Sequence, residues 1–302
     1  NNLQQALPGK GHNPSAGRLS ILANVSAAKI EARLAPGSRL WSTGLIANDR
    51  DGEFSANTLL QFVARVRSAP SRLPQLLMPA AQKSSLAWED FDHIGSQREI
   101  AEKIVASGKT AAILLYGPPG TGKTEFAKLL AERNHGKAVF AGLGDEDGRE
   151  PRRQERLSHL SILRALTFGD SSRIVVMDEA DDILLLGDED RRERSSKLWL
   201  NRLIEGGERP TIWILNEPHL LDRSIVRRMS LAIEFPAPPM HVRRRIVERH
   251  AKKAKLTLSA LDTNRLAALP AAPAVLASAV RGAKLAGGGA DEAQAIGEGL
   301  VT

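Results

Sequence analysis

Short apolar runs alternate with amphipathic stretches across the middle of this 302-residue chain. Five runs have the length and the aliphatic, β-branched character of strands, and they lie near residues 111–116, 137–142, 173–178, 211–215 and 231–235. At least two of them are apolar without interruption, which is typical of strands buried on both faces of a parallel sheet. The pattern predicts an α/β core over residues 86–236, with a parallel sheet sandwiched by helices.

The pattern becomes helical after this core. The prolines of residues 236–239 break the last strand, and three periodic stretches follow, over residues 240–255, 262–269 and 274–286. Their combined size is that of a small helical lid. Gly287-Gly288-Gly289 then predicts a flexible tail.

The segment before the core predicts a separate, mainly helical region. Helical periodicity runs from Leu19 to Leu34, a hairpin-turn signal occupies residues 48–52, and residues 58–66 have the pattern of a short helix. Three prolines between residues 70 and 83 predict a linker. We therefore expect three parts, which are residues 1–85, 86–236 and 237–302.

The first expected strand of the core ends at a glycine-rich loop that reads Gly-Pro-Pro-Gly-Thr-Gly-Lys-Thr over residues 117–124. Glycines let backbone N–H groups approach phosphate oxygens, and the helix that starts at Lys123 adds its positive N-terminal end. Lys123 supplies a charge for the β- and γ-phosphates, and the Thr124 hydroxyl suits Mg²⁺. The sequence thus predicts nucleotide-phosphate binding by Pro118, Pro119, Gly120, Thr121, Gly122, Lys123, Thr124 and Glu125.

Two acidic residues, Asp178 and Glu179, follow the buried strand at 173–178. Ligands bind at the carboxyl ends of such strands, so Asp178 is a candidate metal ligand and Glu179 a candidate base for an attacking water. For the next two acids, Asp181 and Asp182, the simpler interpretation is a helix N-terminus, where carboxylates are favoured.

Two further features follow along the chain. Asn216 ends the strand at 211–215, where an amide can hydrogen-bond the attacking water, although Asn at a strand end is usually turn chemistry. Arg227 and Arg228 precede the last expected strand. A guanidinium suits phosphate oxygens, but an Arg there can also simply cap its helix.

In this order the motifs resemble those of the AAA+ ATPases, in the AAA branch with the second region of homology, and the chain is similar to bacterial members of undefined role. The resemblance covers about residues 86–286, and it includes a segment from Trp88 to Gly95 similar to the family's loop near adenine. It implies adenine contacts from Ile94 and Gly95. It does not cover residues 1–85.

The resemblance also implies an activity and an assembly. We expect ATP and Mg²⁺ as cofactors and ATP hydrolysis, with Glu179 activating water, Asn216 orienting it, and Arg227 or Arg228 completing a neighbouring site. It further implies a homo-oligomer, a hexameric ring, that remodels a protein substrate or binds an adaptor. The region after the second strand lacks the aromatic loop of substrate-threading members, so threading stays open; Arg152, Arg153 and Arg156 there either grip an acidic substrate or pair with nearby acids.

The composition of the chain excludes several kinds of chemistry and predicts where the protein acts. There is no cysteine, so disulfides and thiol chemistry are excluded, and the seven histidines include no His-Glu-x-x-His pair of a zinc protease. No apolar run approaches the about 20 residues of a membrane span, and no signal peptide is visible. These features predict a cytoplasmic protein with no membrane partner. Because the sequence begins at Asn1 and not at Met, a preceding segment stays open.

The net charge of +7 is concentrated at one end, because residues 1–85 hold 10 Lys and Arg against 4 Asp and Glu. One interpretation is a solvated basic surface, and another is a region that binds nucleic acid or an acidic partner. The alternative function is therefore a DNA-associated AAA+ ATPase, and a third option is a nucleotide-gated scaffold. In the lid, the basic residues of 243–255 read as the polar face of a helix, and Arg281 as an exposed helix residue or a phosphate contact.

Overall fold

The computed structural model describes residues 19–21, 24–35, 37–42, 46–48, 54–56, 78, 81–142, 153–185, 194–217 and 221–301. The chain divides into two compact units, of which one comprises residues 1–79 and 141–168 and the other residues 80–140 and 169–302. The second unit begins at residue 80, whereas the sequence placed a boundary after residue 85. The three-part division itself stays a prediction.

The first unit contains α3 (Ala27–Leu34), α4 (Arg39–Ser42), β1 (Ile46–Asn48), β2 (Phe54–Ala56) and α9 (Arg153–Leu166). β1 and β2 pair antiparallel, with Asn48 opposite Phe54, so the expected hairpin is confirmed. The helix expected over residues 19–34 is confirmed only in part, because residues 24–26 are not helical and α3 begins at Ala27. The Trp41 indole N–H donates to the Leu34 carbonyl at 2.7 Å. The expected helix over 58–66 and most of the expected linker lie outside the described residues.

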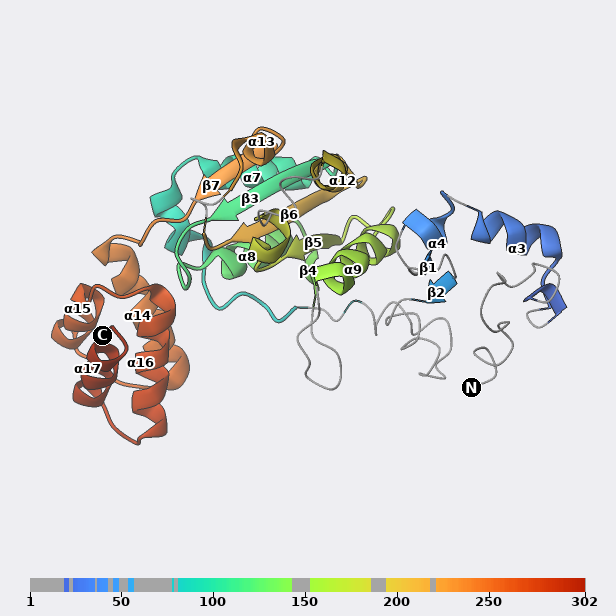
Figure 1. Ribbon diagram of the computed structural model, residues 1–302. Coiled ribbons are helices and arrows are strands. Elements are labelled where there is room, and N and C mark those ends of the chain that lie inside the picture. The colour runs from blue at the N-terminus through green and yellow to red at the C-terminus, as the bar shows by residue number, and fades with distance from the viewer. Residues whose placement is uncertain are drawn as a thin grey trace. The chain divides into compact units, whose positions relative to one another are not determined.

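The second unit is built on a sheet of five strands in the order β4-β5-β6-β3-β7 (Figure 1). The strands are β3 (Ala111–Tyr116), β4 (Lys137–Ala141), β5 (Arg173–Met177), β6 (Pro210–Leu215) and β7 (Leu231–Glu234), all within one residue of the sequence prediction. β6 pairs in parallel with both β3 and β5, and all six of its residues are buried. The expected fold class, a parallel sheet sandwiched by helices, is confirmed.

The helices around this sheet follow the expected α/β pattern. They are η2 (Trp88–Ile94), α7 (Gln97–Ala106), α8 (Lys123–Arg133), α10 (Asp181–Leu184), α12 (Arg194–Glu205) and α13 (Arg223–Val226). Among the described residues, no helix is long and apolar enough to cross a membrane.

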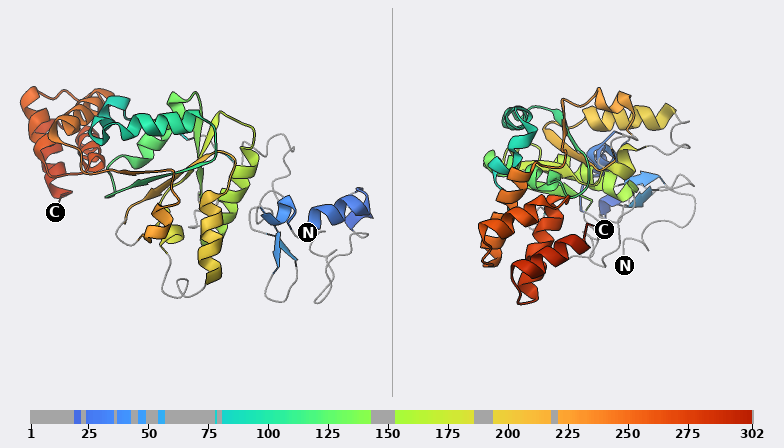
Figure 2. Two further views of the ribbon diagram at one scale, coloured as in Figure 1. Left: turned by 90° about the horizontal axis from the view of Figure 1, so that it is seen from above. Right: turned by 90° about the vertical axis from the view of Figure 1, so that its left-hand side faces the viewer.

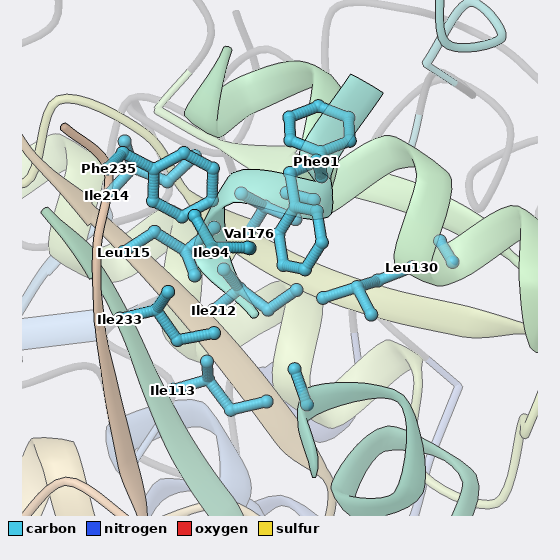
Figure 3. Close-up of a cluster of buried hydrophobic side chains, with 14 of the residues drawn as sticks. Phe91, Ile94, Ile113, Leu115, Leu130, Val176, Ile212, Ile214, Ile233 and Phe235 are labelled. Carbon is cyan, nitrogen blue, oxygen red and sulfur yellow. The ribbon is translucent and has the colours of Figure 1, made fainter. Parts of the chain in front are cut away.

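The main hydrophobic core joins one face of the sheet to α7, α8 and η2 (Figure 3). Side chains two positions apart along a strand point to the same face, and so Ile113 and Leu115 of β3 lie beside Ile212 and Ile214 of β6. Three phenylalanines close this core toward η2. Their ring centroids are 5.0 Å apart for Phe91 and Phe126 and 5.3 Å apart for Phe126 and Phe235. The aromatic contacts therefore fix η2 against the first turn of α8.

The C-terminal helices form a bundle with a hydrophobic core of its own (Figures 1 and 2). They are α14 (Met240–Ala254), α15 (Ala260–Ala268), α16 (Pro273–Leu285) and α17 (Ala290–Gly299). The first three match the expected lid. The expected flexible tail is wrong for α17, because its Ala293 and Gly297 are buried, the latter against Leu269 and Ala279.

The residues just before η2 belong with the sheet. The Ala81 N–H donates to the Ala138 carbonyl of β4 at 3.3 Å, beside the edge of the sheet. The Ser84 and Ser85 N–H groups bind carboxylates of α8 at 2.6 and 2.5 Å. The sequence assigned residues 81–85 to the N-terminal region. Hydrogen bonds attach them to the core instead, and the pattern of apolar residues does not predict such bonds.

Candidate nucleotide site

The order of the strands brings the predicted chemistry to one edge of the sheet. β5, β6 and β3 are neighbours, and their carboxyl ends carry Asp178 with Glu179, Asn216, and the loop over 117–122. These residues and the lid helices line a cavity of about 440 Å³. We call the loop with Lys123, Thr124, Asp178, Glu179 and Asn216 the phosphate side of this cavity.

The loop needs glycine at two positions for reasons visible in the structure. Gly117 has a φ of 135°, and a Cβ there would lie 2.5 Å from the Phe235 carbonyl oxygen. Gly120 has a φ of 76°, and a Cβ there would lie 3.1 Å from the methyl groups of both Ala272 and Ala274. The loop therefore fits between the end of β7 and the start of α16 only if these two positions carry no side chain.

Lys123 is the buried cation of the phosphate side, with 4% of its surface exposed. Its ammonium group donates to the carbonyls of Gly117 and Pro118 at 2.7 and 2.8 Å. Burial lowers the pKa of Lys123, and the charges of Asp178 and Asp181 act in the opposite direction. The loop thus holds the amine of Lys123 in place by its own backbone, beside two carboxylates.

The first turn of α8 meets the end of β5. The Thr124 hydroxyl donates to Asp178 Oδ2 at 2.9 Å, and the Glu179 N–H donates to Asp178 Oδ1 at 3.0 Å. Glu179 is exposed and has a φ of 48°, which is rare for a residue with a side chain. Backbone strain of this kind gathers at functional sites, and here it affects the residue predicted to act on water.

Asp181 has a role that the sequence did not predict. Its Oδ1 accepts hydrogen bonds from the N–H groups of Asn216 and Glu217, both at 3.0 Å. It also begins α10, as the helix N-terminus interpretation expected. Asp181 therefore fixes the backbone that carries Asn216, and no sequence signal identifies this contact between residues 35 positions apart.

The other side of the cavity comes from two segments that are distant in the sequence. One is the strap, which we define as Ser84–Leu86, and the other is the lid, with Ile246 and His250 of α14. The start of α16 adds Pro273 and Ala274, whose N–H donates to the Gly120 carbonyl at 3.2 Å. We call this the strap-and-lid side. Apolar side chains dominate it, with one imidazole.

The predicted adenine contacts do not lie in this cavity. Ile94 is buried in the main core, 7% exposed, and neither Ile94 nor Gly95 lines the cavity. Leu86 and His250 occupy its wall instead. Burial lowers the pKa of His250, as do Lys253 and Arg249, while Glu125 and Asp90 oppose the shift. Its imidazole is therefore neutral at neutral pH.

Some arginines of the lid make structural contacts, and one lines the cavity. Arg245 and Arg249 bind the buried carboxylate of Asp90 or its neighbour Asp92, and Arg243 donates to the Ala267 carbonyl at 2.7 Å. These three side chains are therefore held by contacts within the protein. Arg281 lines the cavity, is exposed, and donates to the Ser278 hydroxyl at 3.1 Å.

The two arginines after α13 differ in their surroundings. Arg228 donates to the Ser224 carbonyl at 2.8 Å and pairs with Glu205 at 3.0 Å. Arg227 is exposed, and its side chain makes no hydrogen bond or ion pair with the described residues. The sequence slightly favoured Arg228 as the residue for a neighbouring subunit. Its own helix and Glu205 occupy it, and Arg227 is the better placed candidate.

Other predicted features fall outside the described residues. These are residues 143–152, which include Arg152 of the expected substrate loop. Arg153 and Arg156 begin α9, and a Cβ on Gly142 would lie 2.7 Å from Arg156 Nε. Whether these arginines grip a substrate stays open.

Comparisons with known proteins agree on the core. Residues 113–237 match the family described as "ATPase family associated with various cellular activities (AAA)". The chain is 26% identical to spastin of Naegleria gruberi over 164 residues, which are 51% of this chain and 31% of spastin. It is 32% identical over 155 residues to a proteasome-activating nucleotidase of Methanocella arvoryzae, covering 48% of this chain and 37% of that protein.

Solved structures support the same fold. The crystal structure of the FIGL-1 AAA domain matches with a TM-score of 0.54 at 17% identity, over 74% of this chain and 80% of that one. The same domain has been solved in complex with ADP, and it matches with a TM-score of 0.51 at 18% identity, over 73% of this chain and 81% of that one. The chain spans about a third of the length of the two curated relatives.

Proposed function

We propose that this chain, whose residues 113–237 match the AAA family of ATPases, binds ATP with Mg²⁺ in the cavity between the phosphate loop and the lid, and hydrolyses it. The observation that carries this proposal is the 2.9 Å hydrogen bond between Thr124 Oγ1 and Asp178 Oδ2. This bond joins the phosphate loop, which follows β3, to the carboxylate at the end of β5, which is two strands away in the sheet.

The donors around Thr124 and Asp178 fit Mg²⁺. This ion prefers oxygen ligands and keeps several waters, so one hydroxyl and one carboxylate beside nucleotide phosphates suffice. When bound, Mg²⁺ would neutralise phosphate charge.

The residues of the phosphate side have separate roles in ATP binding and hydrolysis. Lys123 and the loop N–H groups bind and neutralise the β- and γ-phosphates, since phosphoryl transfer depends on positioning and electrostatics. Glu179 takes a proton from the attacking water, and Asn216, whose backbone is fixed by Asp181, orients that water. The lid adds Arg281 at the cavity wall.

Hydrolysis of this kind also uses an arginine that stabilises the charge of the transition state. We assign this role to Arg227, supplied to the cavity of an adjacent copy of the chain, so that a ring completes the site. Its exposure and its lack of a partner among the described residues support this assignment. For the substrate, we propose a protein that the ring remodels.

The alternative, a DNA-associated ATPase, rests on the charge of the first part of the chain, because residues 1–85 hold 10 basic against 4 acidic side chains. Binding of duplex DNA that weakens steeply between low and moderate salt would support it.

The proposed function is tested by the release of inorganic phosphate from ATP by the purified chain. We expect turnover that requires added Mg²⁺ and stops with a chelator, and an Asp178→Asn variant that turns over at least about 100-fold more slowly. Turnover unchanged in the variant or in the chelator would contradict the proposal.

A further inference from the structure

Glu125 was predicted to bind the nucleotide directly, because it follows Thr124 in the phosphate loop sequence. It does line the cavity, but its carboxylate is bound by the strap. Oε2 accepts hydrogen bonds from the Ser85 N–H at 2.5 Å and the Ser85 hydroxyl at 2.8 Å, and it lies 3.2 Å from the Ser84 hydroxyl. Its other oxygen accepts from the Lys128 ammonium at 2.7 Å.

A second carboxylate of the same helix holds the other end of the strap. Glu132 lies two turns further along α8, and its Oε1 accepts the Ser84 N–H at 2.6 Å. Between these anchors the strap is fixed along α8, so that Ser85 and Leu86 form part of the cavity wall. Leu86 also lies next to the loop, because a Cβ on Gly122 would be 3.5 Å from its Cδ1.

The charge of Glu125 makes a direct role on phosphates unfavourable. A carboxylate one residue after Thr124 would repel the phosphates of a bound nucleotide if it faced them. Burial alone would raise the pKa of Glu125, but the hydrogen bonds from Lys128 and Ser85 bring it below its usual value. The carboxylate is therefore ionised, and its acceptors are directed to the strap and to Lys128.

We propose that Glu125 is a positioning residue, which holds the strap against α8 and through it sets how tightly the base and ribose of the nucleotide bind. This inference rests on the proposed function, since it assigns the strap-and-lid side to the nucleoside half of ATP. The apolar character of Leu86 and Ile246 in this wall suits a base better than a phosphate. The phosphates are left to the loop and Lys123.

The test compares two ligands that share the phosphates and differ in the nucleoside. ATP and inorganic tripolyphosphate are titrated calorimetrically, both with Mg²⁺, into the full chain and its Glu125→Ala variant. Loss of the strap anchor should weaken ATP binding about tenfold, which is about 1.4 kcal/mol, and leave tripolyphosphate binding within about twofold. In steady-state hydrolysis KM for ATP should rise while kcat changes little.

The outcomes separate the two proposals. Equal weakening of both ligands would overturn the inference, because Glu125 would then act on the phosphates, and so would ATP binding that does not change. If the unmodified chain binds neither ligand, the proposed function itself fails.

Three further variants keep the test independent of misfolding. Ser85→Ala removes one hydroxyl bond to Glu125 and should reproduce part of the effect on ATP, with no added effect in the double variant. Glu125→Gln keeps the shape of the side chain and should rescue most of the ATP affinity lost in Glu125→Ala. Glu102→Ala, which breaks the 2.8 Å pair between α7 and Arg133 of α8 and removes no hydrogen bond of the strap, is the matched control and should leave both ligands unchanged.

Discussion

The two sides of the cavity are built in different ways. On the phosphate side, the backbone sets the positions of the groups. They lie at the carboxyl ends of three neighbouring strands, one of which continues into the phosphate loop. On the strap-and-lid side, side chains join distant segments, and Asp90 and Arg249, which meet at 2.9 Å, are 159 positions apart. The difference is between a site encoded in a local motif and a wall assembled by tertiary contacts.

The two sides of the cavity also differ in the interactions that stabilise them. The phosphate loop is held by the core itself, since Gly117 packs on the Phe235 carbonyl at the end of β7. The strap and lid depend on ionic groups. Asp90 is fully buried and accepts from the Ala87 N–H at 2.9 Å as well as from Arg249. Removing one partner of a buried ion pair lowers the free energy of unfolding, because the remaining charge loses the attraction that offset its desolvation.

The largest effect is expected for Arg227, which we propose completes the phosphate side of an adjacent copy. Arg227→Ala should lower kcat for ATP about 1,000-fold and leave ATP binding nearly unchanged, since the guanidinium acts on charge that develops during transfer. Arg228→Ala should have a smaller effect on turnover, because its side chain is engaged by Ser224 and Glu205. The measurement is steady-state phosphate release by each variant.

A mixing experiment tests whether Arg227 acts between copies. Arg227→Ala subunits mixed with Lys123→Ala subunits should regain activity over either variant alone, because an intact pocket can then meet an intact arginine. If both variants assemble and the mixture stays as inactive as they are, the assignment in trans is wrong.

A smaller effect, on stability, is expected on the strap-and-lid side. Asp90→Ala should lower the free energy of unfolding by about 3 kcal/mol, because it leaves Arg249 without its buried partner and the Ala87 N–H without an acceptor. Urea unfolding followed by tryptophan fluorescence measures this change.

The matched control lies on the same lid helix. The pair between Arg244 and Glu248 is about half exposed on both sides, at 3.3 Å. Glu248→Ala should therefore cost less than about 0.5 kcal/mol. Similar losses in Asp90→Ala and Glu248→Ala would show that the strap and lid are not held by the buried ion pair.

The same contrast decides what the sequence could predict. The five strands lie where the sequence predicts them, and Lys123, Thr124, Asp178, Glu179 and Asn216 line one cavity, because their placement follows from apolar periodicity and from parallel strands that share an edge. Three of the lid helices were also recognised from their periodicity.

The strap-and-lid side could not be predicted in the same way. Ser84 and Ser85 look like linker residues until their N–H groups are seen on Glu132 and Glu125. α17 was missed because its alanines and glycines have little apolar contrast, although they pack closely against α16. Ile94 was expected to contact the adenine base, but its side chain is buried in the main core together with Phe91.

The central claim is that the phosphate side binds ATP through Lys123 and hydrolyses it through Glu179. Calorimetric titration of ATP with Mg²⁺ into Lys123→Ala and Glu179→Gln variants, together with their turnover, tests it most directly. Lys123→Ala should lose binding by at least about 100-fold, whereas Glu179→Gln should bind within about threefold and turn over about 1,000-fold more slowly. Equal loss of ATP affinity in the two variants would contradict the account.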